Sequence, residues 1–127
     1  PVGMTLTYAN AGHPAPRVGA AEDPARWRPL AAPHRLPLGV NPRVTAYPDL
    51  HLWFEPGDRL AVYTDGITDT TDRAGEPFGF ERLDAALAAA RGGANGVVAE
   101  LVGAADQFAD GVPPADDRTL VVVRRTE

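Results

Sequence analysis

The stretch "LAVYTDGITD", residues 60–69, begins as an apolar strand and ends with an aspartate and a glycine. Asp-Gly is among the commonest turn dipeptides, so Asp65 on its own is first interpreted as a turn residue. The alternative is that the strand holds the Asp65 carboxylate in a fixed place at the rim of a sheet. The segments on either side of this stretch bear on the choice.

Composition limits the classes of function. The chain has 127 residues, 44% of them hydrophobic and 23% charged, which are ordinary proportions for one folded domain. It has no cysteine, a net charge of −5 and scattered arginines, so a surface for nucleic acid or an anionic membrane is not expected. No apolar run approaches the roughly 20 residues that cross a bilayer. We therefore expect a cytoplasmic protein that binds neither nucleic acid nor membrane.

The beginning of the chain resembles the inside of a domain. Position 1 is a proline, and Met4 lies within the alternating stretch "GMTLTYA". This alternation predicts a strand at residues 4–8, which ends at "NAGHP". A short return strand at residues 17–19 is expected to pair with it as a hairpin. We expect a piece of a longer chain.

The middle of the sequence contains a second expected hairpin. Residues 20–43 show little periodicity and are expected to be mostly loop, apart from a short strand at residues 27–30. Apolar residues then alternate at residues 50–54, "EPGD" forms a turn, and the strand at residues 59–64 returns.

The last third changes to helical periodicity and back to strand, which predicts an α+β class. Two amphipathic helices are expected, the first ending at Gly92 and the second near Gly111. The run "TLVVV" at residues 119–123 predicts a strand that is buried on both faces or lies in the middle of a sandwich. The expected apolar stripes of the helices are Phe80, Leu83, Leu87 and Ala90, and Val97 or Val98 with Leu101, Ala105 and Phe108.

Carboxylates follow one strand and precede another. Asp65 comes after the strand at residues 59–64, and Asp116 and Asp117 come before the last strand. If these strands are antiparallel neighbours, Asp65 lies beside Asp116 or Asp117 at one rim. Neighbouring carboxylates repel each other unless a cation lies between them, and the chain has no lysine. Oxygen ligands favour Mg²⁺ or Mn²⁺.

Each polar feature also has a simpler interpretation. "PPADDR" is equally typical of a solvated acidic loop, and a histidine in a turn, such as His13, is more often exposed than a ligand. His34 and His51 suggest no function. The histidines do not have the spacing of a zinc site.

Five motifs in order change this balance: "LTYANAGHPAP", "LPLG", "EPGDRLAVYTDGITD", "GEPFGFERL" and "DDRTLVVVRR". From Leu6 to Arg125 the chain resembles the C-terminal part of the metal-dependent (PPM-type) serine/threonine protein phosphatases. The likeness is to the bacterial sporulation and stress-response branch that includes stage II sporulation protein E. The resemblance implies that residues 1–127 are the C-terminal part of a single domain, an αββα sandwich of antiparallel sheets that is incomplete at the N-terminus.

The resemblance also implies which residues bind metal. Asp65 matches one metal aspartate of a site for two Mn²⁺ or Mg²⁺ ions, and Asp116 matches another, with Asp117 as the adjacent alternative. Because side chains alternate along a strand, only one of this pair is expected to face the ions. Asp69 falls where this branch often has glutamate and is a further candidate.

Other positions are expected at the edge of the same site. Asn10 and His13 are candidates for its rim, and eukaryotic relatives have an aspartate associated with a further metal where His13 falls. Gly12 and Gly66 are expected to allow tight backbone paths near the ions, and Gly66 is a candidate metal contact.

In the family, the metals activate a water that attacks phosphoserine or phosphothreonine in a regulatory protein, such as an anti-sigma factor antagonist. Sensor domains upstream in the complete chain are further candidate partners. The metal-bridging aspartate of the family lies upstream of any residue here, so we expect no activity from residues 1–127 alone. Two hypotheses follow: a phosphatase that is catalytic when complete, or a non-catalytic phosphatase-like binding module.

Overall fold

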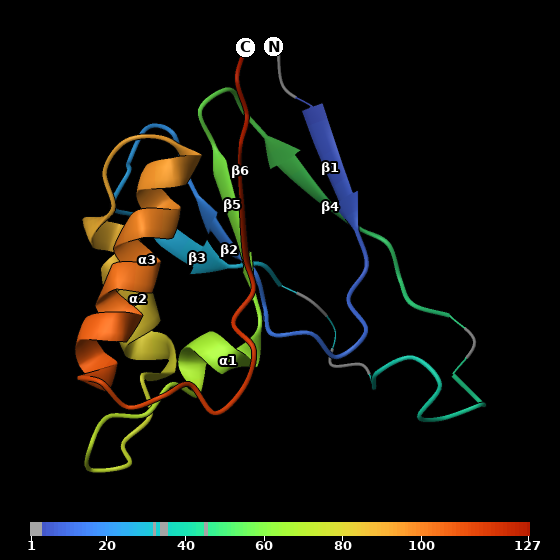
Figure 1. The fold of residues 1–127 in the computed structure, drawn as a ribbon. Helices are drawn as coiled ribbons and strands as arrows, with labels where there is room; N and C mark the ends of the chain where they lie inside the picture. The colour runs from blue at the N-terminus through green and yellow to red at the C-terminus, as the bar shows by residue number, and fades with distance from the viewer. Residues whose placement is uncertain (1–3, 32, 34–35, 45) are drawn as a thin grey trace.

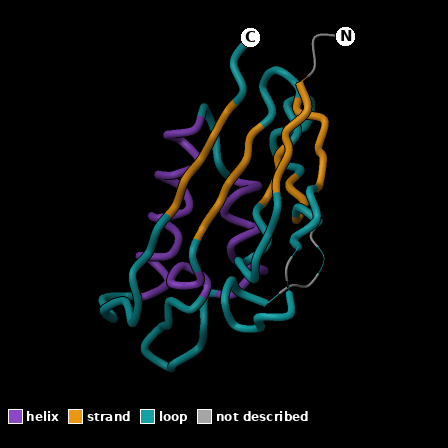
Figure 2. Tube along the Cα trace, turned by 90° about the vertical axis from the view of Figure 1, so that its right-hand side faces the viewer, coloured by secondary structure: helices purple, strands orange, loops and turns teal. Residues whose placement is uncertain are grey.

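The computed structural model describes residues 4–31, 33, 36–44 and 46–127, so His34 lies outside the described part. Figure 1 shows three layers: a pair of long helices, a four-stranded sheet, and a two-stranded sheet on the side away from the helices. The strands run roughly along one direction, as Figure 2 shows from the side. The predicted α+β class with antiparallel sheets is confirmed.

The four-stranded sheet carries the segments of greatest interest. Its order is β3 (Trp27–Pro29), β2 (Arg17–Gly19), β5 (Arg59–Tyr63) and β6 (Leu120–Arg124), with every neighbour antiparallel. The strands predicted in these four regions are confirmed. Strand β6 pairs with all of β5, so the start of β6 lies beside the end of β5.

The two-stranded sheet consists of β1 (Met4–Tyr8) and β4 (Leu50–Phe54). Both strands were predicted, but neither predicted hairpin forms: β1 pairs with β4 instead of β2, and β4 does not pair with β5. Eight residues join β1 to β2 and include Pro14 and Pro16, which have no N–H to donate to a ladder. This connection takes the chain from one sheet to the other.

The turn between β4 and β5 forms, but it does not join the two strands as a hairpin, because they belong to different sheets. The Asp58 amide donates to the Glu55 carbonyl at 3.0 Å, and the Asp58 carboxylate accepts from the Glu55 amide at 2.8 Å. The Gly57 amide donates to the Arg125 carbonyl, and the Arg125 amide donates to the Asp58 carbonyl, each at 2.9 Å. The turn is therefore bonded to the chain after β6, and the backbone passes between the sheets here.

The main core lies between the four-stranded sheet and the helices. Helix α1 (Asp65–Thr68) follows β5, and α2 (Gly79–Ala89) and α3 (Ala94–Ala109) precede β6. The buried cluster that these elements share consists of Ala61, Tyr63, Ile67, Phe78, Leu83, Ala86, Leu87, Ala90, Val97, Leu101 and Ala105. Except at Phe80, both predicted helical stripes therefore face this core, with Val97 rather than Val98 as the buried valine.

Two predictions of burial are wrong. Phe80 is 54% exposed, because Phe78, just before the helix, occupies the buried position. Val121 and Val123 of β6 are 51% and 48% exposed, whereas Leu120 and Val122 pack on the core. Helices cover only one face of β6, so alternate side chains remain accessible. In the described part of the chain, no helix is both long and apolar enough to span a membrane.

Candidate functional site

The pairing of β5 with β6 continues past both strands and fixes the position of Asp65. The Thr64 amide donates to the Thr119 carbonyl at 3.0 Å, and the Thr119 amide donates to the Thr64 hydroxyl oxygen at 2.9 Å. The next residue along from Thr64 is Asp65, the first residue of α1. Its backbone is therefore anchored to the segment that enters β6.

Gly66 packs against this same segment. A Cβ atom built on Gly66 would overlap the carbonyl oxygen of Asp117 and come within 3.3 Å of the Asp116 carbonyl oxygen. The Thr64 hydroxyl donates to the Asp117 carbonyl at 3.2 Å, which holds the two segments together. The expected tight backbone path at Gly66 is confirmed, as is the expected juxtaposition of the Asp65 segment with Asp116 and Asp117.

The side chains of Asp65, Asp116 and Asp117 are all exposed. One carboxylate oxygen of Asp116 accepts a hydrogen bond from the Asp117 amide at 2.7 Å. Both residues lie in the loop before β6, which begins at Leu120. The expectation that strand alternation separates them is therefore wrong, because neither residue is in the strand.

Asp69 directly follows α1 and lies about one helical turn after Asp65. Its amide donates to the Asp65 carbonyl at 2.7 Å, and residues four apart share one side of a helix. The Gly66 carbonyl accepts a hydrogen bond from the Thr70 hydroxyl at 3.0 Å. The Gly66 oxygen thus already has a protein partner, while the Asp69 side chain is exposed.

Asn10 and His13 form a turn of their own. The Asn10 side chain donates to the His13 carbonyl at 3.0 Å and accepts from the His13 amide at 2.8 Å. Gly12 between them has φ +83° and packs on Pro37. Figure 1 shows the loop after β1 at the same end of the molecule as α1. No hydrogen bond or ion pair joins Asn10 or His13 to Asp65 among the described residues.

The described acidic residues form only part of a metal site. Within the ranges that the structure describes, no group of three or more His, Cys, Asp or Glu side chains could hold a metal ion. Asp65, Asp116 and Asp117 supply oxygen ligands of the kind Mg²⁺ and Mn²⁺ prefer, from two segments in contact. The described residues therefore fit part of a metal site and do not complete one.

Sequence reasoning missed Thr64 and Thr70. Thr64 joins the two acidic segments through its hydroxyl, and Thr70 binds the Gly66 carbonyl. A hydroxyl residue directly before Asp-Gly at a strand end is a usable signal for the first. Its partners lie more than 50 positions away, so no local pattern names them.

Solved structures share this arrangement of sheets and helices. The SiaA-PP2C domain of Pseudomonas aeruginosa has a TM-score of 0.76 and 22% identity, over 94% of this chain and 46% of that chain. The PP2C phosphatase domain, with a fragment of the regulatory domain, of SpoIIE from Bacillus subtilis has a TM-score of 0.75 and 18% identity, over 94% and 34%. The RsbU and RsbW domains of a Mycobacterium tuberculosis protein have a TM-score of 0.68 and 22% identity, over 98% and 33%.

The fold is therefore that of PP2C (PPM-type) phosphatase domains, and this chain spans a third to a half of those three structures. The family model for stage II sporulation protein E (SpoIIE) matches residues 1–126. The chain belongs to the SpoIIE family, a family of regulatory protein phosphatases. No curated protein sequence matches it significantly.

Proposed function

We propose that this chain supplies two metal-binding aspartates, Asp65 and Asp116, to a Mn²⁺- or Mg²⁺-dependent serine/threonine phosphatase. The observation that supports this most is the packing of Gly66 on the backbone of Asp117 and Asp116. It holds two carboxylate-bearing segments together at one rim, although they are about 50 residues apart in the sequence. Membership of the SpoIIE family supports the class of reaction.

The chain's own residues position charge in this proposal. Thr64 bonds to both Thr119 and Asp117, so the backbone that carries Asp65 is fixed relative to the other acidic segment. The exposed carboxylates of Asp65, Asp116 and Asp117 attract cations, and they repel one another when no cation is bound. A bound divalent ion supplies a water of lowered pKa and a clamp for phosphoryl oxygens. A complete site needs further oxygen ligands besides these three carboxylates.

The proposed substrate is a phosphoserine or phosphothreonine in a regulatory protein, such as an antagonist of an anti-sigma factor. This choice rests on the family, and on the RsbU and RsbW domains named in one structural relative. An exposed rim suits a phosphorylated side chain presented by a folded protein.

The test is the substitution Asp65→Asn in the full-length protein, assayed with Mn²⁺ and a phosphorylated peptide. Asparagine keeps the turn-forming ability but removes a charge, so turnover should fall by orders of magnitude. The melting temperature in chelator should hardly change. The matched control is Asp23→Asn, because Asp23 is also exposed and lies in the loop between β2 and β3, near the start of β5 and not its end. Turnover near wild type in Asp65→Asn would leave Asp65 as a turn residue.

A second comparison separates the adjacent acids. We expect Asp116→Ala to weaken Mn²⁺ binding, measured by titration calorimetry, more than Asp117→Ala does. Asp117→Ala should keep the contact between the two segments, because Thr64 donates to the Asp117 backbone carbonyl and not to its side chain. A larger loss at Asp117 would reverse the assignment.

A non-catalytic phosphatase-like module is the second candidate. It is favoured by the absence of a complete ligand group among the residues that the structure describes. The full-length protein discriminates the two: turnover that needs Mn²⁺ or Mg²⁺ supports the enzyme. Binding of a phosphoprotein without turnover, at saturating metal, supports the module.

A further inference from the structure

A second polar site lies at the other end of the β5–β6 pair. A cavity of about 390 Å³ is bordered by the turn after β4, the end of α2 and the end of β6. Three arginines line it: Arg59, Arg91 and Arg124. Arg59 begins the strand that Asp65 follows, so at about 3.3 Å per residue the two sites are roughly 20 Å apart.

Two of the three arginines are held in place by the protein. Arg59 is buried, donates to the Pro24 carbonyl at 2.8 Å and stacks on Trp27, with 4.8 Å from its guanidinium carbon to the ring centroid. Arg91 donates from one terminal nitrogen to the last carbonyls of α2, which leaves its other N–H groups available. Side chains that are already ordered lose little entropy when a ligand binds.

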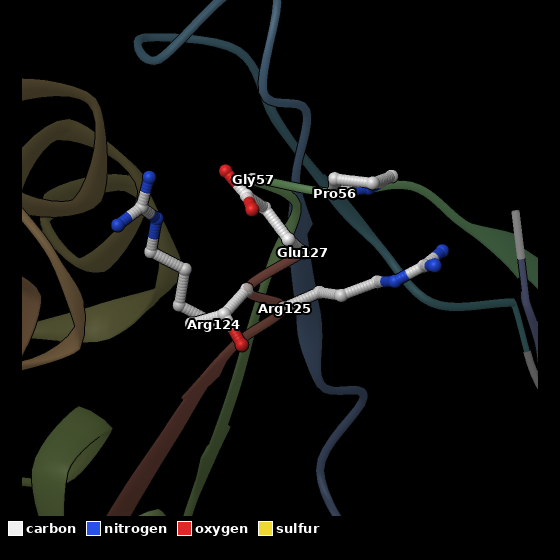
Figure 3. Close-up of a pocket in the computed structure, with 6 residues that line it drawn as sticks. Pro56, Gly57, Arg124, Arg125 and Glu127 are labelled. Carbon is white, nitrogen blue, oxygen red and sulfur yellow. The ribbon is translucent and has the colours of Figure 1, made fainter. Parts of the chain in front are cut away.

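The third arginine has no such anchor. Arg124 is exposed, and its side chain makes no hydrogen bond or ion pair to any described residue. It lies directly opposite Arg59 across the β5–β6 ladder, where like charges are destabilising. Figure 3 shows Arg124 extending toward the helices, while Arg125 extends the other way.

Among the described residues, acidic side chains offset the charge of this cluster only in part. Asp58 lies nearby, but its two carboxylate oxygens accept from the amides of Ala21 and Glu55. Burial and the charges of Arg124 and Arg91 together lower the pKa of Arg59, and Asp58 opposes this only in part. Glu127 borders the neighbouring cavity of about 520 Å³, yet no ion pair joins it to Arg124 in the described structure.

We propose that Arg59, Arg91 and Arg124 form a binding site for a phosphoryl anion, separate from the aspartate rim. Guanidinium groups match phosphate oxygens in geometry, and three positive charges suit a group that carries two negative ones better than a single carboxylate. The cavity has room for a small organic part beyond the phosphoryl group. A bound anion would also relieve the repulsion between Arg59 and Arg124.

The experiment measures binding of inorganic phosphate and of adenosine monophosphate to the full-length protein by calorimetry, at low ionic strength and in chelator. The chelator removes any metal from the aspartate rim, so the measured binding cannot come from phosphate bound to a metal ion there. Arg124→Gln and Arg91→Gln should each weaken binding about tenfold or more, because each removes charge-assisted hydrogen bonds. Arg43→Gln, which alters an exposed arginine elsewhere, should leave affinity unchanged.

The melting temperature without ligand distinguishes a loss of binding from a loss of structure. Arg124→Gln should keep or slightly raise the melting temperature without ligand, because it removes a charge opposite Arg59. Equal binding of phosphate and the nucleotide would assign the site to the phosphoryl group alone, and tighter binding of the nucleotide would assign it to an organic phosphate. The proposal is overturned if neither ligand binds, if chloride at equal ionic strength competes as well as phosphate, or if Arg124→Gln binds like wild type.

Discussion

On one face of the four-stranded sheet, Ala61 and Tyr63 are buried beneath α2 and α3, whereas on the other face Val121 and Val123 are about half exposed. The contrast runs through a single strand, because Val122 lies between those two valines and packs on the core. Strand preference is the same for all three valines. Burial is therefore set by what packs on each face and not by the residue type.

The helical face is closed by well-matched side chains. Phe78 and Phe108 meet edge to face with ring centroids 5.6 Å apart, and Leu87 and Leu101 are fully buried between the helices and the sheet. Even the buried Arg17 is satisfied on this face, by Asp84 and the Ala15 carbonyl. Substitutions on the two faces should therefore differ greatly in their effect on stability.

The largest effect is expected for Leu87→Ala. Removing a fully buried leucine side chain should lower the free energy of unfolding by about 2–5 kcal/mol, because a cavity is left in a packed core. Val123→Ala, on the open face, should cost less than about 1 kcal/mol. Urea denaturation of both variants measures the difference. Similar losses would mean that the open face is covered in the native protein.

The core was accessible to sequence reasoning for a physical reason. Leu83, Leu87, Val97 and Leu101 recur at helical spacing, and the helices bury that stripe whatever the sheet topology. Phe80 broke the pattern because Gly79, with φ +70°, changes the entry into the helix and leaves Phe78 to fill the core.

Strand partners were less accessible. "EPGD" has the composition of a hairpin turn, but its Gly57 amide bonds to the carbonyl of Arg125, about 70 residues later. Such a partner cannot be read from a local pattern. The rim was predictable in outline, because the antiparallel pairing of β5 and β6 requires Asp65 to lie near the residues before Leu120. The loop geometry of Asp116 and Asp117 was not.

An intermediate effect is expected where the aspartate rim depends on close backbone packing. Gly66→Ala should lower the free energy of unfolding by about 1–3 kcal/mol. The new methyl group would overlap the Asp117 carbonyl, so the backbone of one of the two segments must shift. The control is Gly103→Ala in α3, where no atom lies within 4 Å. Alanine there should raise stability by about 0.5–1 kcal/mol, because it restricts the unfolded chain and favours helix.

These two glycine variants are compared by thermal and urea unfolding in chelator, so that metal binding does not contribute. A loss at Gly66 with a gain at Gly103 would support close packing as the reason for the first glycine. Equal stability of Gly66→Ala and wild type would show that the Asp65 and Asp117 segments are not held in contact in solution.

The smallest expected effect tests whether burial on the helical face also decides how much an ion pair contributes to stability. Arg17 and Asp84 form an ion pair at 2.7 Å in which the Arg17 side chain is only 7% exposed, whereas both members of the Arg73–Asp110 pair are largely exposed. Asp84→Asn should cost about 1 kcal/mol, because a buried guanidinium loses its counter-charge while the amide oxygen still accepts a hydrogen bond. Asp110→Asn should change stability by less than about 0.5 kcal/mol, since exposed pairs contribute little and asparagine tolerates the left-handed φ of 47° at this position. Urea unfolding at low and high salt distinguishes the pairs, because salt screens the exposed pair more than the buried one. If Asp110→Asn proved the more damaging change, the connection that follows α3 would matter more to stability than the buried charge, and the contrast between the two faces would not extend to electrostatics.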